Sequence, residues 1–184
     1  MLRNTDRSWG APAKLLHWAV AMLVFVQFGL GWAAVSWRMS PTKLDLFVWH
    51  KSIGVLILLL MVARLAWRAV NVAPSLPAGV PAVERFAARL SHVLLYVLLL
   101  LMPVTGWIIN SAANIPFLIF WQVPLPAIVS PDQALADAAK HVHLALFILL
   151  ALLVLVHVGA ALRHHFVKRN AVLTRMLPGR AGAR

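Results

Sequence analysis

The stretch that decides the fold is residues 142–162, which read VHLALFILLALLVLVHVGAAL. It contains no Asp, Glu, Lys or Arg, and about 20 such residues in a helix cross the roughly 30 Å hydrocarbon core of a bilayer. The crossing must be helical because lipid offers no partner for free backbone N–H and C=O groups. Residues 142–162 are therefore predicted to form a transmembrane helix, and this helix carries two histidines, His143 and His157.

Three further stretches have the same apolar character, and residues rich in Pro and Gly separate them. The second stretch carries Lys51 and Arg64 near its ends, where long side chains can reach the headgroups. We expect one domain over residues 1–184, an all-α integral membrane bundle of four helices. The predicted spans are about 15–36, 46–67, 90–109 and 142–162. Loops are predicted at the Ser40-Pro41 step and over 71–81 and 116–131.

Composition agrees with a membrane protein and excludes several classes of site. The chain has 184 residues, of which 62% are hydrophobic and 12% charged, which is too apolar for a soluble domain of this size. With no cysteine, it cannot form disulfides, iron–sulfur clusters or a thioether-linked haem. Its formal charge of +12 is expected of cytoplasmic loops beside anionic lipid, so nucleic acid is not an expected partner.

The distribution of Lys and Arg predicts the orientation. Thirteen of them fall on one side of the predicted spans and four on the other, which places both termini in the cytoplasm by the positive-inside rule. In a bacterium, the protein would then lie in the inner membrane with the cation-poor side facing the periplasm. The cation-rich side holds Arg3, Arg7, Lys14, Arg64, Arg68, Arg85, Arg89, Arg163, Lys168, Arg169, Arg175, Arg180 and Arg184, and the other side holds Arg38, Lys43, Lys51 and Lys140.

Histidines inside the spans are costly and indicate a functional site. Residues fourteen apart on a helix lie about 21 Å apart along the axis and within roughly 40° of one face, so His143 and His157 address the same neighbours near opposite ends of the span. With the predicted orientation, His143 lies on the periplasmic side and His157 on the cytoplasmic side. His17 and His50 lie in the opening turns of spans that start from opposite sides. Depth therefore pairs His17 with His157 and His50 with His143.

Two imidazoles at matched depth on facing helices suit the axial positions of a b-type haem, which needs no covalent attachment. We therefore expect two haems b, with these four histidines as ligands of the haem iron. One alternative is that each histidine only hydrogen-bonds across helices. A bare zinc or copper site is less consistent, because Cys, Asp and Glu are not nearby to complete its shell. Small residues that would leave room for a macrocycle are Gly29, Gly31, Gly54, Gly106 and Gly159.

Several motifs resemble those of the bacterial cytochrome b561 family, and the resemblance extends over essentially the whole chain. They are His17-Trp18, His50-Lys51-Ser52-Ile53-Gly54 running into Met61-Val62-Ala63-Arg64-Leu65, Pro103-Val104-Thr105-Gly106, the spacing of His143 and His157, and Leu173-Thr174-Arg175-Met176-Leu177-Pro178. That family is related to the cytochrome b subunits of nickel–iron hydrogenase and formate dehydrogenase. The resemblance implies two haems b on the same four histidines and electron transfer across the membrane to or from quinone.

Small stand-alone members of this family include superoxide oxidase, which passes electrons from periplasmic superoxide through both haems to ubiquinone. Lys51 and Lys140 lie next to His50 and one turn from His143, where they would steer a small anion or pair with haem propionates. Quinone reduction consumes protons, and His92, Arg163 and His164 on the cytoplasmic side are candidates near the quinone. Depth leaves His92 without a histidine partner. The alternative to a place near the quinone is a purely structural role for this residue.

Superoxide:ubiquinone oxidoreductase is thus the favoured function, and two others stay open. The main alternative is a non-enzymatic diheme electron carrier or anchor subunit that links quinone to a separate dehydrogenase or a periplasmic partner. It would require a partner redox protein, whereas the enzyme would act alone or as a homo-oligomer. A transporter or receptor without a cofactor is the third reading, and it would require histidine pairs free of haem.

Overall fold

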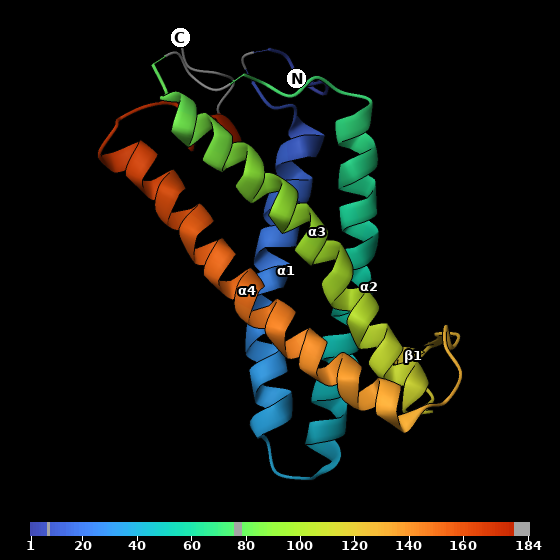
Figure 1. Ribbon diagram of the computed structural model, residues 1–184. Coiled ribbons are helices and arrows are strands. Elements are labelled where there is room, and N and C mark those ends of the chain that lie inside the picture. The colour runs from blue at the N-terminus through green and yellow to red at the C-terminus, as the bar shows by residue number, and fades with distance from the viewer. Residues whose placement is uncertain (7, 76–78, 179–184) are drawn as a thin grey trace.

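A computed structural model of the chain describes residues 1–6, 8–75 and 79–178 (Figure 1). All four of its long helices are long and apolar enough to cross a membrane, which confirms the predicted four-helix membrane bundle. Each helix contains one predicted span and most extend it at both ends. The elements in chain order are α1 (Ala11–Ser36), α2 (Pro41–Ala69), α3 (Ala82–Ala112), β1 (Leu118–Ile119), β2 (Val123–Pro124), α4 (Gln133–Phe166) and the 3-10 helix η1 (Thr174–Met176).

Two of the four long helices, α2 and α4, begin at a side-chain cap. Ser40 accepts a hydrogen bond from the N–H of Lys43 at the start of α2, and Asp132 accepts one from Leu135 at the start of α4. Proline lies in the first turn of α1 and of α2, where its missing N–H costs no helical hydrogen bond. The predicted loop 116–131 contains the short antiparallel pair of β1 and β2.

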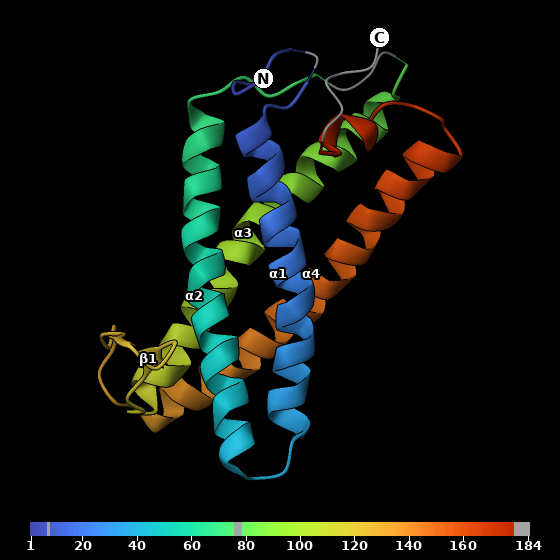
Figure 2. The ribbon, with the colours of Figure 1, turned by 180° about the vertical axis from the view of Figure 1, so that it is seen from behind.

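The helices form two hairpins that cross. Among the described residues, the closely packed helix pairs are α1 with α2, α3 with α4 and α2 with α3. The α3–α4 hairpin runs obliquely across the α1–α2 hairpin (Figures 1 and 2). Both ends of the described chain lie at one end of the bundle, hereafter the termini end, together with the α2–α3 connection. The α1–α2 turn and the β1–β2 pair lie at the other end, hereafter the hairpin end.

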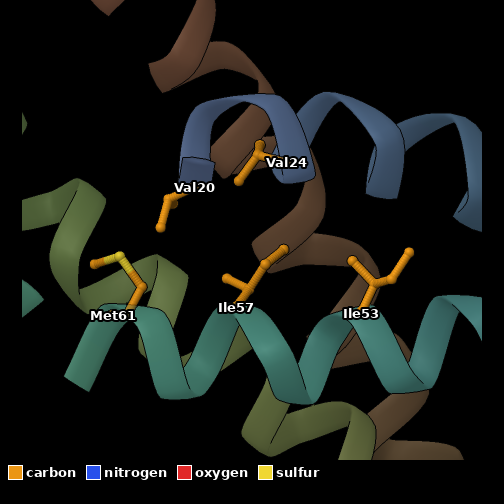
Figure 3. Packing of buried hydrophobic residues seen from close by; sticks show 5 residues of the cluster. All are labelled: Val20, Val24, Ile53, Ile57 and Met61. Carbon is orange, nitrogen blue, oxygen red and sulfur yellow. The ribbon is translucent and has the colours of Figure 1, made fainter. Parts of the chain in front are cut away.

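A small apolar core joins the two hairpins between these ends. Its buried members are Val20, Val24, Ile53, Ile57 and Met61, which face one another across α1 and α2 (Figure 3). Partly buried side chains of α3 and α4 pack against this cluster. Most other large apolar side chains are exposed, as expected of helices that face lipid. The core therefore separates the termini end from the hairpin end with tightly packed aliphatic side chains.

Polar contacts fix the helix ends at the termini end. Glu84 at the start of α3 forms an ion pair with Lys168, whose Nζ lies 2.6 Å from Oε1. The indole N–H of Trp18 donates to the carbonyl of Met176 over 2.8 Å, so η1 is held against α1. Both ends of the described chain lie on one side of the bundle, as four spans require. Three of the counted cations lie outside the described residues, namely Arg7, Arg180 and Arg184.

Candidate functional site

The structure brings the four span histidines together as two pairs, in the combination that depth predicts. The ring centres of His17 on α1 and His157 on α4 are 6.4 Å apart at the termini end. Those of His50 on α2 and His143 on α4 are also 6.4 Å apart, at the hairpin end. One face of α4 thus presents an imidazole to α1 and another to α2.

The spacing within each pair fits two imidazoles that share one metal. A bond from an imidazole nitrogen to a metal is about 2 Å, so rings on opposite sides of one ion have centres about 6 Å apart. Neither α1 and α4 nor α2 and α4 are among the closely packed helix pairs of the described chain. Each pair therefore bridges helices whose backbones leave room for a flat group, and a two-nitrogen donor set suits a b-type haem.

Hydrogen bonding across helices gives a poor account of two of these histidines. The Nδ1 atom of His17 is buried without a hydrogen-bond partner in the described part of the chain, and that of His50 makes no well-formed hydrogen bond, although the backbone carbonyl of Gln27 lies near its ring. A buried polar atom without a partner is costly in hydrocarbon, so these rings need another reason to be there. His143 differs, because its Nδ1 lies 2.8 Å from the hydroxyl of Thr105 on α3.

A bare metal site is also disfavoured. In residues 1–6, 8–75 and 79–178, no group of three or more His, Cys, Asp or Glu side chains lies close enough to hold a metal ion. Zinc normally takes four protein ligands in a structural site and three in a catalytic site. The donor chemistry thus favours a macrocycle that brings its own equatorial nitrogens.

Of the five glycines predicted to leave room for a macrocycle, two adjoin the imidazoles at the hairpin end. A Cβ at Gly31 would lie 3.1 Å from Cε1 of His50, and one at Gly106 would lie 3.6 Å from Cε1 of His143. A Cβ at Gly54 would instead meet the Gln27 side chain at 3.4 Å. Gly31 is therefore the glycine whose missing side chain matters most for the position of a histidine ring.

The remaining two glycines have open surroundings. A Cβ at Gly29 or at Gly159 would meet no atom of the described residues within 4 Å. Gly159 follows His157 by two residues, so its open surroundings lie at the termini end.

His92 lies beside the termini-end pair and does have a histidine neighbour. Its ring centre is 5.5 Å from that of His157. It also lines a cavity of about 530 Å³ between α2 and α3, with Arg68, Arg89, Tyr96 and four aliphatic side chains. Depth alone did not predict this contact, because α3 tilts across the bundle and brings its first turns toward α4.

Arg163 and His164 lie outside the lining of that cavity. Both face Glu84, whose carboxylate is 3.3 Å from Nη1 of Arg163 and 3.7 Å from Nε2 of His164. The other ring nitrogen of His164 lies 2.8 Å from the side-chain amide of Asn170. Of the three residues predicted near a quinone, only His92 therefore borders the cavity.

The two lysines predicted to face a small anion have different surroundings. Lys51 Nζ donates to Oδ1 of Asn110 over 2.6 Å and lies 5.3 Å from the ring centre of Phe117. Lys140 is half-exposed and its Nζ is 2.8 Å from the carboxylate of Asp137. Lys51 is thus a cation held by neutral groups, whereas the charge of Lys140 is largely offset by its partner.

Three residues of the site were missed by the sequence analysis. Thr105 contacts His143, Asn110 holds Lys51, and Gln27 donates to the backbone carbonyl of His50 over 2.9 Å. All three are uncharged polar residues in helices that cross the membrane, which is the signal that could have singled them out.

Comparison with known proteins identifies the family. A family model described as prokaryotic cytochrome b561 matches residues 8–179. The chain belongs to the prokaryotic cytochrome b561 family. Membership confirms the resemblance and makes the chain an integral inner-membrane protein of a family that transfers electrons with haem b.

Curated members of the cytochrome b561 family match along nearly their whole length. Cytochrome b561 homolog 2 of Escherichia coli (strain K12) is 33% identical over 181 residues, covering 95% of this chain and 93% of the relative. Cytochrome b561 homolog 1 of the same strain is 29% identical over 90% of this chain and 94% of the relative. The probable superoxide oxidase CybB of Yersinia pestis is 28% identical over 91% of this chain and 94% of the relative.

Proposed function

We propose that this cytochrome b561 binds two haems b, one between His17 and His157 and one between His50 and His143, and moves electrons from superoxide to ubiquinone. The observation that carries this proposal is the equal 6.4 Å spacing of two imidazole pairs at opposite ends of one bundle. When bound, the haems supply one-electron redox chemistry. The four histidines would hold the haems, and the chain supplies the apolar slots and the packed core between them.

The positive-inside rule predicts the orientation of the protein in the membrane, from which the direction of electron transfer follows. The cation-rich termini end would face the cytoplasm and the hairpin end the periplasm. The His50/His143 pair then lies where an extracytoplasmic donor arrives, and the His17/His157 pair lies near the inner leaflet. Electrons would therefore cross the bundle from the hairpin end to the termini end.

At the hairpin end, Lys51 is the residue that we assign to attract superoxide. Oxidation of superoxide to oxygen releases one electron and needs no proton, so this end requires a positive potential and no acid or base. The Lys51 ammonium is adjacent in sequence to His50 and its partner Asn110 is uncharged. A cation in a rim of low dielectric raises the encounter rate of a small anion. The relative named probable superoxide oxidase supports the choice of substrate.

At the termini end, the cavity beside His92 is the place that we assign to ubiquinone. Each ubiquinone accepts two electrons and two protons, so two superoxide ions are oxidised for each quinol formed. Arg68, Arg89 and His92 provide donors to quinone oxygens, and the aliphatic wall accepts the apolar ring. Arg163 and His164, which share Glu84, lie at the same end. His164 would pass protons from the cytoplasm, and Arg163, which stays charged, would orient Glu84.

The test is made on the detergent-purified protein. A pyridine haemochrome spectrum gives the haem type and the haem-to-protein ratio, which we expect to be about two of haem b. Rapid mixing with superoxide should reduce the haem, superoxide dismutase should abolish that reduction, and added ubiquinone should reoxidise it. Full haem content with no reduction by superoxide would refute the enzymatic proposal and favour a diheme carrier. A ratio near zero in haem-replete cells would refute both.

A further inference from the structure

A short chain of hydrogen bonds runs behind His143. The hydroxyl of Thr105 donates to the backbone carbonyl of Met102 over 2.8 Å, and the same oxygen lies 2.8 Å from Nδ1 of His143. A hydroxyl has one hydrogen and two lone pairs. Because that hydrogen points to Met102, the Thr105 oxygen can only accept from His143. The proton of the His143 ring therefore resides on Nδ1, and Nε2 keeps its lone pair.

The motif Pro103-Val104-Thr105-Gly106 builds this arrangement. A threonine hydroxyl inside a helix commonly donates to the carbonyl three or four residues earlier, and Met102 lies three residues before Thr105. Gly106 follows directly and adjoins the same ring, since a Cβ there would lie in ordinary contact with Cε1 of His143, at 3.6 Å. One turn of α3 thus supplies the acceptor for Nδ1 and packs against the imidazole on α4.

We propose that Thr105 is a positioning residue that sets the tautomer and ring orientation of His143 and lowers the reduction potential of the haem at the His50/His143 pair. This inference rests on the proposed function, since it assumes that a haem binds there. A hydrogen bond accepted from Nδ1–H makes the ligating nitrogen a stronger donor, which stabilises the oxidised iron. An acceptor that is itself a donor to a carbonyl is strengthened further.

The effect should be confined to one of the two haems. Nδ1 of His17, in the other pair, has no hydrogen-bond partner in the described chain, and the group near the ring of His50 is the backbone carbonyl of Gln27. Among these three rings, His143 is therefore the one with a side-chain hydroxyl as partner, backed by the carbonyl of Met102. Removing its hydroxyl should move one redox transition and leave the other in place.

The experiment compares three variants of the purified haem-loaded protein. Thr105→Val keeps the shape and removes the hydroxyl, whereas Thr105→Ser keeps the hydroxyl and removes a methyl group. Thr174→Val is the matched control, because the Thr174 hydroxyl also donates to a carbonyl three residues earlier but lies in η1. Haem content, optical redox titration and the electron paramagnetic resonance signals of the ferric haems are measured for each.

We expect Thr105→Val to raise one of two midpoint potentials and to shift one ferric signal, while Thr105→Ser and Thr174→Val match the unchanged chain. Loss of one haem in Thr105→Val but not in Thr105→Ser would also support the proposal, because valine has nearly the shape of threonine and lacks only its hydroxyl. Unchanged potentials and signals at full haem content would overturn it, as would equal haem loss in the Ser and Val variants. Absence of haem from the unchanged chain would instead refute the proposed function.

Discussion

The two histidine pairs have the same ring spacing and very different surroundings. At the hairpin end, a glycine adjoins His50 and a threonine holds His143, so that pair is closely fitted. At the termini end, a cavity of about 530 Å³ lies beside the pair and a further histidine, His92, reaches His157. Under the proposed function, superoxide would react at the closely fitted end and quinone would bind in the cavity at the other end.

If the proposed function holds, this contrast explains how one helix could serve two different reactions. The histidine donors are the same at both ends, so they would not determine which substrate reacts at each end. What differs is hydrogen bonding, access and local charge, which are the properties by which a protein tunes a metal centre. The division of labour between the ends therefore lies in the residues around the imidazoles.

The largest effect on the two histidine pairs should come from replacing one of the four histidines. His50→Ala or His143→Ala should lower the haem-to-protein ratio from about two to about one, and so should His17→Ala or His157→Ala, because each haem needs both of its imidazoles. Redox titration then shows which transition remains in each variant. The first two variants should keep one transition and the last two the other.

His92→Ala is the control for the termini end, since His92 lies nearer to His157 than His17 does. We expect it to retain both haems, because α3 and α4 are closely packed and leave less room between them than α1 and α4. Loss of the haem in His92→Ala with retention in His17→Ala would show that His92 is the ligand.

A smaller effect should come from Gly31→Ala. The added methyl group would lie 3.1 Å from His50 Cε1, so the ring must move by a few tenths of an ångström. We expect partial loss of the haem at the His50/His143 pair, measured by haem content and by the amplitude of its redox transition. Val35→Ala, at an exposed position of the same helix, should leave both haems in place. Equal behaviour of the two variants would mean that the hairpin end is not closely fitted.

The smallest effect should come from removing the positive charge of a lysine at the hairpin end. Lys51→Gln should slow reduction by superoxide by about two- to tenfold at low ionic strength and weaken its salt dependence, because one attracting charge is lost. Lys140→Gln should change the rate less, since the Lys140 side chain is exposed to solvent that screens its charge. Stopped-flow rates across a salt series measure both. A larger effect of Lys140→Gln would contradict the assignment of Lys51.

Much of this fold could be predicted from the sequence because each span is a local property. The run 142–162 is apolar throughout, and α4 extends from Gln133 to Phe166 around it. The added turns are polar at their ends, so hydropathy alone could not include them. The pairing of His17 with His157 followed from depth, which is set by helical rise within a bilayer of fixed thickness.

Contacts between helices could not be read in the same way. The approach of His92 to His157, the bond from Thr105 to His143 and the pairing of Lys140 with Asp137 depend on the rotation and tilt of each helix. An amphipathic pattern would normally report that rotation, but a helix that faces lipid on one side and apolar neighbours on the other has little such pattern.

The sequence by itself determined four spans, the depth of four histidines and a family. Backbone groups in lipid must be satisfied within their own helix, so length and hydropathy decide where the chain crosses. Only the tertiary structure decided which end is open, which lysine is unpaired with a carboxylate and which imidazole is hydrogen-bonded. Those features depend on side chains from different helices meeting at distances of a few ångströms, and the crossing of the two hairpins sets those distances.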